Sequence, residues 1–216
     1  MENYKSEKII FTAPSGAINA SLMSTSNSTA ELAVVLPGAG YPCTMPLLYY
    51  SIDALLLKGY QVLAIEKVYG DDVAWRGFQT REAAFKYVED DTLELFAQIS
   101  KMFSERVKIL LGRSLGTYQM ACALEKKIVQ PRQVVWQTPS LYEKWSVIKD
   151  SGVAGFGIIG TLDPRYGTAL PYFPQDRIVV DGADHAMEVP GNVARSIEVL
   201  GEVIRATDEW LLSAES

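Results

Sequence analysis

The segment GRSLG at positions 112–116 sets a serine between two glycines in the pattern G-x-S-x-G. An apolar run at 107–111 precedes it and a helix-forming run follows it, so the serine is expected at a strand-to-helix turn. At such a turn Ser114 adopts a strained backbone with its hydroxyl exposed, and a glycine two residues to either side lets strand and helix approach closely. Short motifs match by chance, but this context predicts that Ser114 is a nucleophile.

The helix expected after Ser114 would also stabilise the charge that forms when the serine attacks a carbonyl. Its first backbone amides have no partner within the helix, and the helix dipole is positive at that end. We therefore predict that the amide of Leu115 donates a hydrogen bond to the oxyanion.

A second oxyanion donor is expected from the loop PGAGY at 37–41, which follows a predicted strand. Small residues in this loop allow a backbone amide to face a substrate. We assign this donor to Ala39. A shift of the loop register would assign it instead to Gly40 or Tyr41.

His185 is the only histidine of the chain, and it lies in the segment DGADH between the last predicted strand and the last predicted helix. A lone histidine is more often a surface or core residue, but this loop follows the carboxyl end of a strand, where open α/β sheets place their sites. An imidazole, with a reference pKa of about 6.5, suits a base that takes the Ser114 proton and returns it to the leaving group. We predict that His185 is this base.

Three aspartates are candidates for the acid that orients the imidazole: Asp163, Asp181 and Asp184. Adjacency argues against Asp184, because a side chain next in sequence to the histidine tends to point away from it. The orienting carboxylate must reach the far ring nitrogen from a separate loop. Asp163 follows the predicted strand at 155–160 and meets that need. It also gives the chain order Ser, Asp, His that accompanies a G-x-S-x-G turn.

Short apolar runs that alternate with helix-period segments predict an α/β fold with about eight strands. Two of them flank Pro14, Ser15 and Gly16 and form an antiparallel hairpin, whereas the others read as near-continuous Val, Ile and Leu, typical of parallel strands covered on both faces. The expected strands are 8–13, 17–23, 32–36, 61–66, 107–111, 133–136, 155–160 and 177–180.

Amphipathic helices are predicted to cover both faces of the sheet. The apolar residues between Thr80 and Phe103 recur with a period near 3.6, as do those between Val193 and Leu211. Residues 141–150 suffice for one crossover helix, which leaves no room for a cap over the site. The interval 67–79 is expected to form at most a flap beside it.

Composition favours a single domain over residues 1–216, with a hydrophobic content of 48%. A net charge of −6 without a basic tract argues against nucleic acid as a partner. No export signal or membrane-spanning run is recognised, so we expect a cytoplasmic protein without membrane association. The sequence does not indicate the oligomeric state.

The cysteines at positions 43 and 122 lack metal-binding or redox spacing, and both are expected to be reduced and buried. Because the chain has one histidine and its cysteines are far apart, we predict no metal site.

Together these segments resemble the α/β-hydrolase family, specifically its small lidless esterases and dienelactone-hydrolase-like members. The resemblance rests on LPGAGY, GRSLG, GTLDPR and DGADH and covers residues 8–211 approximately. It implies an α/β-hydrolase fold with the base at His185 and the acid at Asp163. The sequence departs from the family at Pro37, where a histidine often stands, and this leaves the register of the second oxyanion donor open.

The resulting hypothesis is a serine hydrolase that acts on a small-molecule ester or thioester through an acyl-enzyme and needs no cofactor. The same three residues would also support hydrolysis of a C–C bond or a lyase reaction. A third possibility is a non-catalytic ligand-binding protein on the same scaffold, since fold alone does not determine function.

Overall fold

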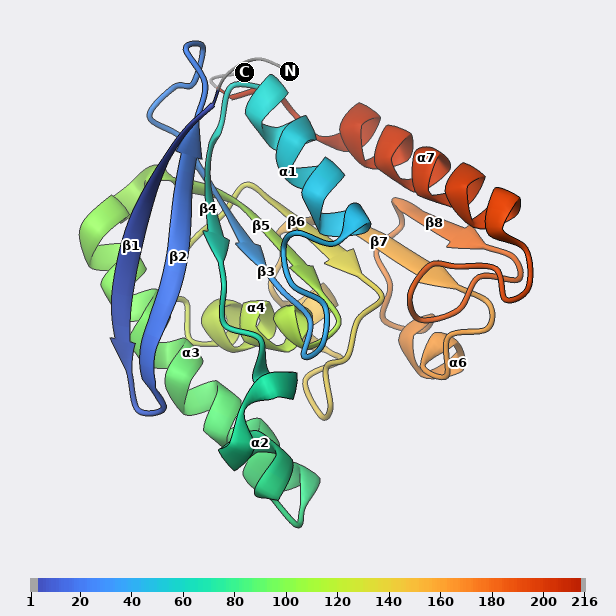
Figure 1. Ribbon diagram of the computed structural model, residues 1–216, viewed down its shortest axis with the longest axis horizontal. Coiled ribbons are helices and arrows are strands. Elements are labelled where there is room, and N and C mark those ends of the chain that lie inside the picture. The colour runs from blue at the N-terminus through green and yellow to red at the C-terminus, as the bar shows by residue number, and fades with distance from the viewer. Residues whose placement is uncertain (1–3, 215–216) are drawn as a thin grey trace.

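The computed structural model describes residues 4–214, which are built around one mixed sheet (Figure 1). The strands lie in the order β1-β2-β4-β3-β5-β6-β7-β8. Strand β2 is antiparallel to its neighbours β1 and β4, and the other neighbouring pairs are parallel. The strands are β1 (Lys5–Ala13), β2 (Gly16–Ser24), β3 (Leu32–Leu36), β4 (Gln61–Ile65), β5 (Val107–Arg113), β6 (Gln133–Gln137), β7 (Ala154–Gly160) and β8 (Arg177–Val180).

The eight strands and the opening hairpin confirm the expectation from the apolar runs. The largest differences in bounds are at β1, which begins three residues before the predicted start at 8, and at β5, which continues two residues past the predicted end at 111. Strand β5 does so because Arg113 still pairs with Gln137 of β6. The strand therefore runs directly into Ser114, with no intervening loop to loosen its position.

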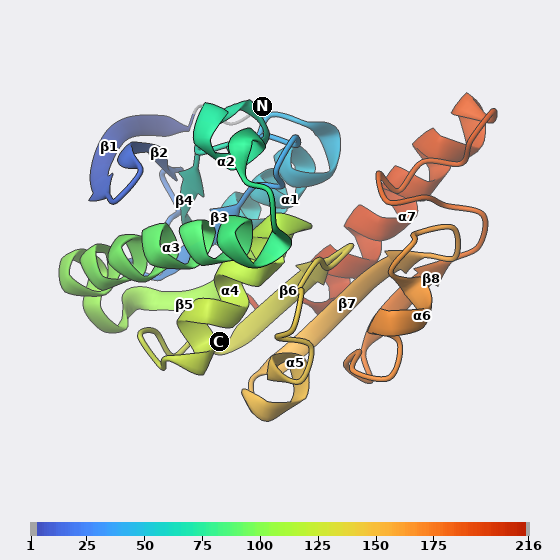
Figure 2. The ribbon, with the colours of Figure 1, turned by 90° about the horizontal axis from the view of Figure 1, so that it is seen from below.

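Helices cover the two faces of the sheet (Figure 2). Helices α3 and α4 pack on one face and α1 and α7 on the other. Within residues 4–214, no helix combines the length and apolar composition needed to cross a lipid bilayer. The helices are α1 (Pro46–Leu57), α2 (Val73–Gly77), α3 (Arg81–Phe103), α4 (Leu115–Glu125), α5 (Val147–Asp150), α6 (Tyr166–Ala169) and α7 (Val193–Trp210), with 3₁₀ turns η1 (Tyr69–Asp71) and η2 (Ser104–Arg106).

The inner strands are apolar along their whole length because they face two cores. Successive side chains of a strand point to opposite faces. In β3, Leu32, Val34 and Leu36 enter the core beneath α3 and α4, and Ala33 and Val35 enter the core beneath α1 and α7. Water is excluded from both sides, which explains the continuous runs of Val, Ile and Leu.

The connection between β6 and β7 differs from the expected crossover helix at 141–150. Its helix, α5, has only four residues. Tyr142 has a φ of +53°, a left-handed conformation that does not continue a right-handed helix. The preceding segment instead forms turns, such as the one in which the Lys144 amide donates to the Leu141 carbonyl. In the described part of the chain this connection adds no cap over the sheet, as expected.

The interval 67–79 forms a flap of two short helices, η1 and α2. Asp72 holds it together, since its carboxylate accepts the amide of Ala74 at 2.8 Å and pairs with Lys67 at 2.5 Å. The Gly70 amide donates to the Ala39 carbonyl at 2.5 Å. The flap is thus tied to the loop that follows β3.

We predict that Gly160→Ala destabilises the fold, because a Cβ at this position would lie 2.0 Å from the carbonyl oxygen of Ala183. The backbone must shift to relieve that contact, and overpacking of this kind costs about 1–3 kcal/mol. Gly201→Ala in α7 is the matched control, because its Cβ would meet no atom within 4 Å and alanine favours helix by about 1 kcal/mol. Urea unfolding measures both variants, and a wild-type midpoint for Gly160→Ala would contradict the close approach.

Candidate active site

Ser114 occupies the strained turn that the motif predicts. It lies between the last residue of β5 and the first of α4, with φ 52° and ψ −114°. Its amide donates to the carbonyl of Gln137 on β6 at 2.9 Å, so the turn is held by the neighbouring strand. A non-glycine residue in this conformation is costly unless its surroundings over-determine it. The strained backbone expected at position 114 is confirmed.

The two motif glycines allow three backbones to meet at Ser114. A Cβ on Gly112 would lie 2.5 Å from Sδ of Met120 and 2.7 Å from the carbonyl carbon of Gly116. A Cβ on Gly116 would lie 2.3 Å from the carbonyl oxygen of Leu36. Side chains at either position would separate α4 from β5 and β3. The role that the sequence assigns to these glycines is confirmed.

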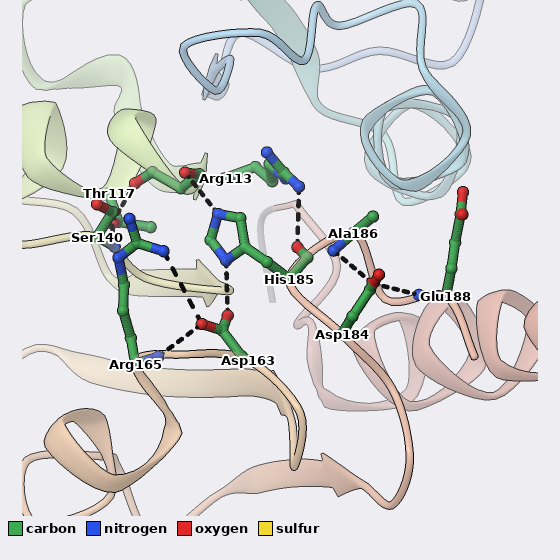
Figure 3. A network of polar contacts seen from close by, with 10 residues as sticks. Arg113, Thr117, Ser140, Asp163, Arg165, Asp184, His185, Ala186 and Glu188 are labelled. Carbon is green, nitrogen blue, oxygen red and sulfur yellow. Dashed lines mark hydrogen bonds and ion pairs between the residues drawn. The ribbon is translucent and has the colours of Figure 1, made fainter. Parts of the chain in front are cut away.

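The structure brings Ser114, His185 and Asp163 into one hydrogen-bonded chain, of which Figure 3 labels His185 and Asp163. Nε2 of His185 lies 2.9 Å from Oγ of Ser114, and Nδ1 lies 2.6 Å from Oδ2 of Asp163. The network assigns the proton to Nδ1, because an ionised carboxylate can only accept. The lone pair of Nε2 then faces the serine hydroxyl.

Asp163 is only 3% exposed and lies between β7 and α6. Burial acts to raise its pKa, but hydrogen bonds from His185 and from the Arg165 amide, reinforced by the charges of these two residues, outweigh burial and lower the pKa of Asp163 below its usual value. The Arg165 amide donates to Oδ1 at 2.9 Å, so both carboxylate oxygens are engaged. The carboxylate is therefore ionised and fixed in orientation.

The two competing aspartates shape turns of the backbone. Oδ1 of Asp184 accepts the amides of Ala186 and Glu188, at 2.8 Å and 3.1 Å. Oδ1 of Asp181 accepts the hydroxyl of Thr161 at 3.0 Å. Figure 3 shows the Asp184 carboxylate on the other side of the histidine backbone from Asp163. This geometry supports the choice of Asp163.

Both predicted oxyanion donors lie beside Ser114. Leu115 and Ala39 line the same cavity as the serine. Leu115 is the first residue of α4, where an amide has no acceptor within the helix. For the second donor, the Tyr41 amide is directed to the Gly38 carbonyl, which argues against that register. Of the three candidates, Ala39 alone is among the lining residues of this cavity, and its role as donor stays a prediction.

Solved structures of the same architecture identify the fold. The chain aligns with a dienelactone hydrolase from Anabaena variabilis over 96% of each chain, with a TM-score of 0.70 and 17% identity. It aligns with an α/β serine hydrolase homologue from Coxiella burnetii over 95% of this chain and 97% of that one, with a TM-score of 0.66 and 17% identity. The chain has the α/β-hydrolase fold. A member of the α/β serine hydrolases without a lid, from Xanthomonas campestris, aligns over 97% of both chains, with a TM-score of 0.64 and 15% identity. No protein-family model and no curated protein sequence matches the chain.

In this lidless α/β-hydrolase fold, a cavity of about 440 Å³ opens over Ser114. Four of its twelve lining residues are aromatic, and the rings of Phe85 and Tyr142 stack with centroids 4.7 Å apart. Two arginines, Arg81 and Arg165, also line it, whereas none of its described lining residues is acidic. The other aromatic lining residues are Trp75 and Trp145. The two arginines give this wall a basic character in a chain whose net charge is −6, and Nη1 of Arg165 also lies 3.9 Å from Oδ1 of Asp163.

Most of the cavity wall was not identified from the sequence. Ser114, Leu115 and Ala39 are the lining residues that the sequence assigns to the site, and Trp75 belongs to the interval 67–79 expected to form a flap beside it. Phe85 belongs to the apolar stripe of α3 and was therefore assigned to the core. Arg165 follows Asp163 by two residues, and this proximity to the predicted acid is the one signal that points to it.

The cysteines and potential metal ligands give no sign of chemistry here. Both cysteines are free, and burial raises the pKa of each thiol to about 12. Cys122 is buried as expected, whereas Cys43 is only partly buried, with its Sγ donating to the Ile65 carbonyl. Within the described residues, no group of three or more His, Cys, Asp or Glu side chains is arranged to hold a metal ion.

Proposed function

We propose that the protein is a serine hydrolase that cleaves a small ester or thioester through an acyl-enzyme on Ser114. The observation that carries the proposal is the hydrogen-bonded chain Ser114–His185–Asp163, with distances of 2.9 Å and 2.6 Å, at the mouth of a cavity. The alignment with a dienelactone hydrolase of the same fold supports ester chemistry.

The first step forms the acyl-enzyme. Nε2 of His185 takes the hydroxyl proton as Oγ of Ser114 attacks the carbonyl carbon, and the carbonyl oxygen becomes an oxyanion. The amides of Leu115 and Ala39 donate to this oxygen. Donors that are already held in place stabilise the oxyanion more than the same donors would in water. The imidazolium then gives its proton to the leaving alcohol or thiol, and the ester bond breaks.

The second step regenerates the enzyme. Nε2 of His185 removes a proton from a water molecule, which attacks the acyl carbon and releases the acid as the proton returns to Oγ of Ser114. In both steps Asp163 keeps the proton on Nδ1 and stabilises the positive imidazolium. Its lowered pKa keeps it ionised near neutral pH. The cycle needs no cofactor.

Ser114→Ala tests the function directly. We expect it to lose nearly all ester turnover and all labelling by a fluorophosphonate probe, because no hydroxyl remains for attack. Thermal unfolding should change little, since the substitution removes a single oxygen whose described side-chain contact is the hydrogen bond with Nε2 of His185. Retained turnover in the purified variant would overturn the assignment. Absence of both turnover and labelling in the wild-type protein would favour the non-catalytic ligand-binding alternative.

Asp163→Asn tests the choice of acid. An amide in place of the carboxylate favours the wrong imidazole tautomer, and we expect kcat to fall by about 10⁴-fold. Asp184→Asn is the matched control, because Asp184 accepts only backbone amides of its own turn among the described contacts. Steady-state kinetics on one ester would decide between them, and a larger loss in Asp184→Asn would refute the choice.

Substrate size and charge follow from the cavity. Its volume is about 440 Å³ and no cap extends it, so long acyl chains gain little transition-state binding. We expect kcat/KM for p-nitrophenyl esters to peak at short acyl chains, and a steady rise to sixteen carbons would contradict this.

Because Arg81 and Arg165 line the cavity, a short acyl group that ends in a carboxylate should be preferred over its neutral equivalent. Arg81→Met should weaken that preference while retaining turnover of the neutral ester, because Arg165, and not Arg81, pairs with Asp163 among the described ion pairs.

A further inference from the structure

Arg113 precedes the nucleophile, yet its side chain turns away from the cavity. It is the last residue of β5 and only 7% exposed. In Figure 3 its guanidinium lies on the opposite side of the imidazole from Asp163. Nη2 donates to the backbone carbonyl of His185 at 2.9 Å. Arg113 is thereby attached to the loop that carries the base.

The same guanidinium packs against the loop that carries Ala39. Its central carbon lies 4.2 Å from the centroid of the Tyr41 ring, a cation–π contact. A Cβ on Gly38 would lie 2.9 Å from Nη1, so the Gly38 backbone rests directly on the guanidinium. The Gly38 amide donates to the Tyr41 carbonyl at 3.0 Å and closes the loop around Ala39. One side chain therefore contacts both the base loop and the oxyanion loop.

The buried charge of Arg113 destabilises the folded protein. Within residues 4–214, no carboxylate lies in ion-pair distance of its guanidinium, and Nε is buried without a hydrogen-bond partner in the same part of the chain. Burial lowers the pKa of Arg113, although a guanidinium remains protonated in proteins. Burying an unpaired charge costs free energy, and an apolar side chain of similar length would avoid that cost.

We infer that Arg113 is a positioning residue that joins the His185 loop to the Gly38–Tyr41 loop and places a buried positive charge behind the oxyanion site. This inference rests on the proposed hydrolysis. Arg113 does not line the cavity, so it acts on the transition state and not on substrate binding. The hydrogen bond fixes the backbone of the base, and the cation–π and backbone contacts fix the loop of the second oxyanion donor.

The test compares Arg113→Met, which keeps length and removes charge, with Arg113→Lys, which keeps charge but lacks the planar fork. We expect Arg113→Met to lower kcat by about 10–100-fold, less than the 10²–10³-fold cost of removing an oxyanion donor itself. KM should stay within about two-fold, since ground-state binding is unchanged. Arg113→Lys should fall between. Arg177→Met is the matched control, because Arg177 is exposed and its guanidinium also donates to a backbone carbonyl, that of Pro174.

Binding of a short alkyl boronic acid separates positioning from a general loss of structure. This probe forms a tetrahedral anion on the serine and so reports on transition-state stabilisation. In Arg113→Met the affinity for the boronic acid should fall in parallel with kcat. An ester that is not cleaved should bind equally well to Ser114→Ala and to the double variant that carries both Ser114→Ala and Arg113→Met. Circular dichroism checks folding, and if Arg113→Met fails to fold, Arg113→Lys carries the same two comparisons.

The outcomes distinguish the two proposals. Ser114-dependent turnover with wild-type kcat and boronate affinity in the folded Arg113 variants overturns the positioning role alone. A rise in KM at unchanged kcat also overturns it, because it would assign Arg113 to substrate binding. Absence of Ser114-dependent turnover in the wild-type protein overturns both proposals.

Discussion

The site depends on the close approach of three backbones at the carboxyl edge of the sheet. Gly116 of α4 lies against the Leu36 carbonyl at the end of β3, and Gly112 of β5 lies against Gly116. Ser114 between them takes a φ of 52°, which its surroundings enforce. This contact directs the hydroxyl toward Nε2 of His185 and the first amides of α4 toward the same space. If the backbones separated, the Ser114 hydroxyl and the Leu115 amide would move apart.

Because the strands that carry these residues are parallel, the loops after β3, β5, β7 and β8 all lie at one edge of the sheet. Additional contacts then set these loops against one another. Gly160 beside Ala183 joins the loop of the acid to that of the base. Arg113 contacts the base loop and the loop after β3, and the Gly70 amide ties the flap to Ala39. Residues as far apart in the sequence as Ala39 and His185 are thereby held close to Ser114.

The sequence predicts the strands well because both faces of the sheet are buried, which makes each inner strand a continuous apolar run. Ser114, Asp163 and His185 were found because their chemistry requires particular residue types in loops after strands, and the structure brings them together. Of the helix expected at 141–150 only residues 147–150 form, because Tyr142 adopts a left-handed backbone that composition does not reveal. The direction of Arg113 and the inclusion of Phe85 in the cavity depend on tertiary packing, so no local pattern indicates them.

Trapping the acyl-enzyme is the most direct measurement of the central claim. The wild-type protein would be mixed with p-nitrophenyl acetate, quenched in acid within the first turnover, and analysed by intact mass and peptide mapping. We expect one added acetyl group, on the peptide that contains Ser114, at a rate that matches the release of nitrophenol. Turnover with no acetyl group on that peptide, or with the acetyl group on another residue, would contradict it.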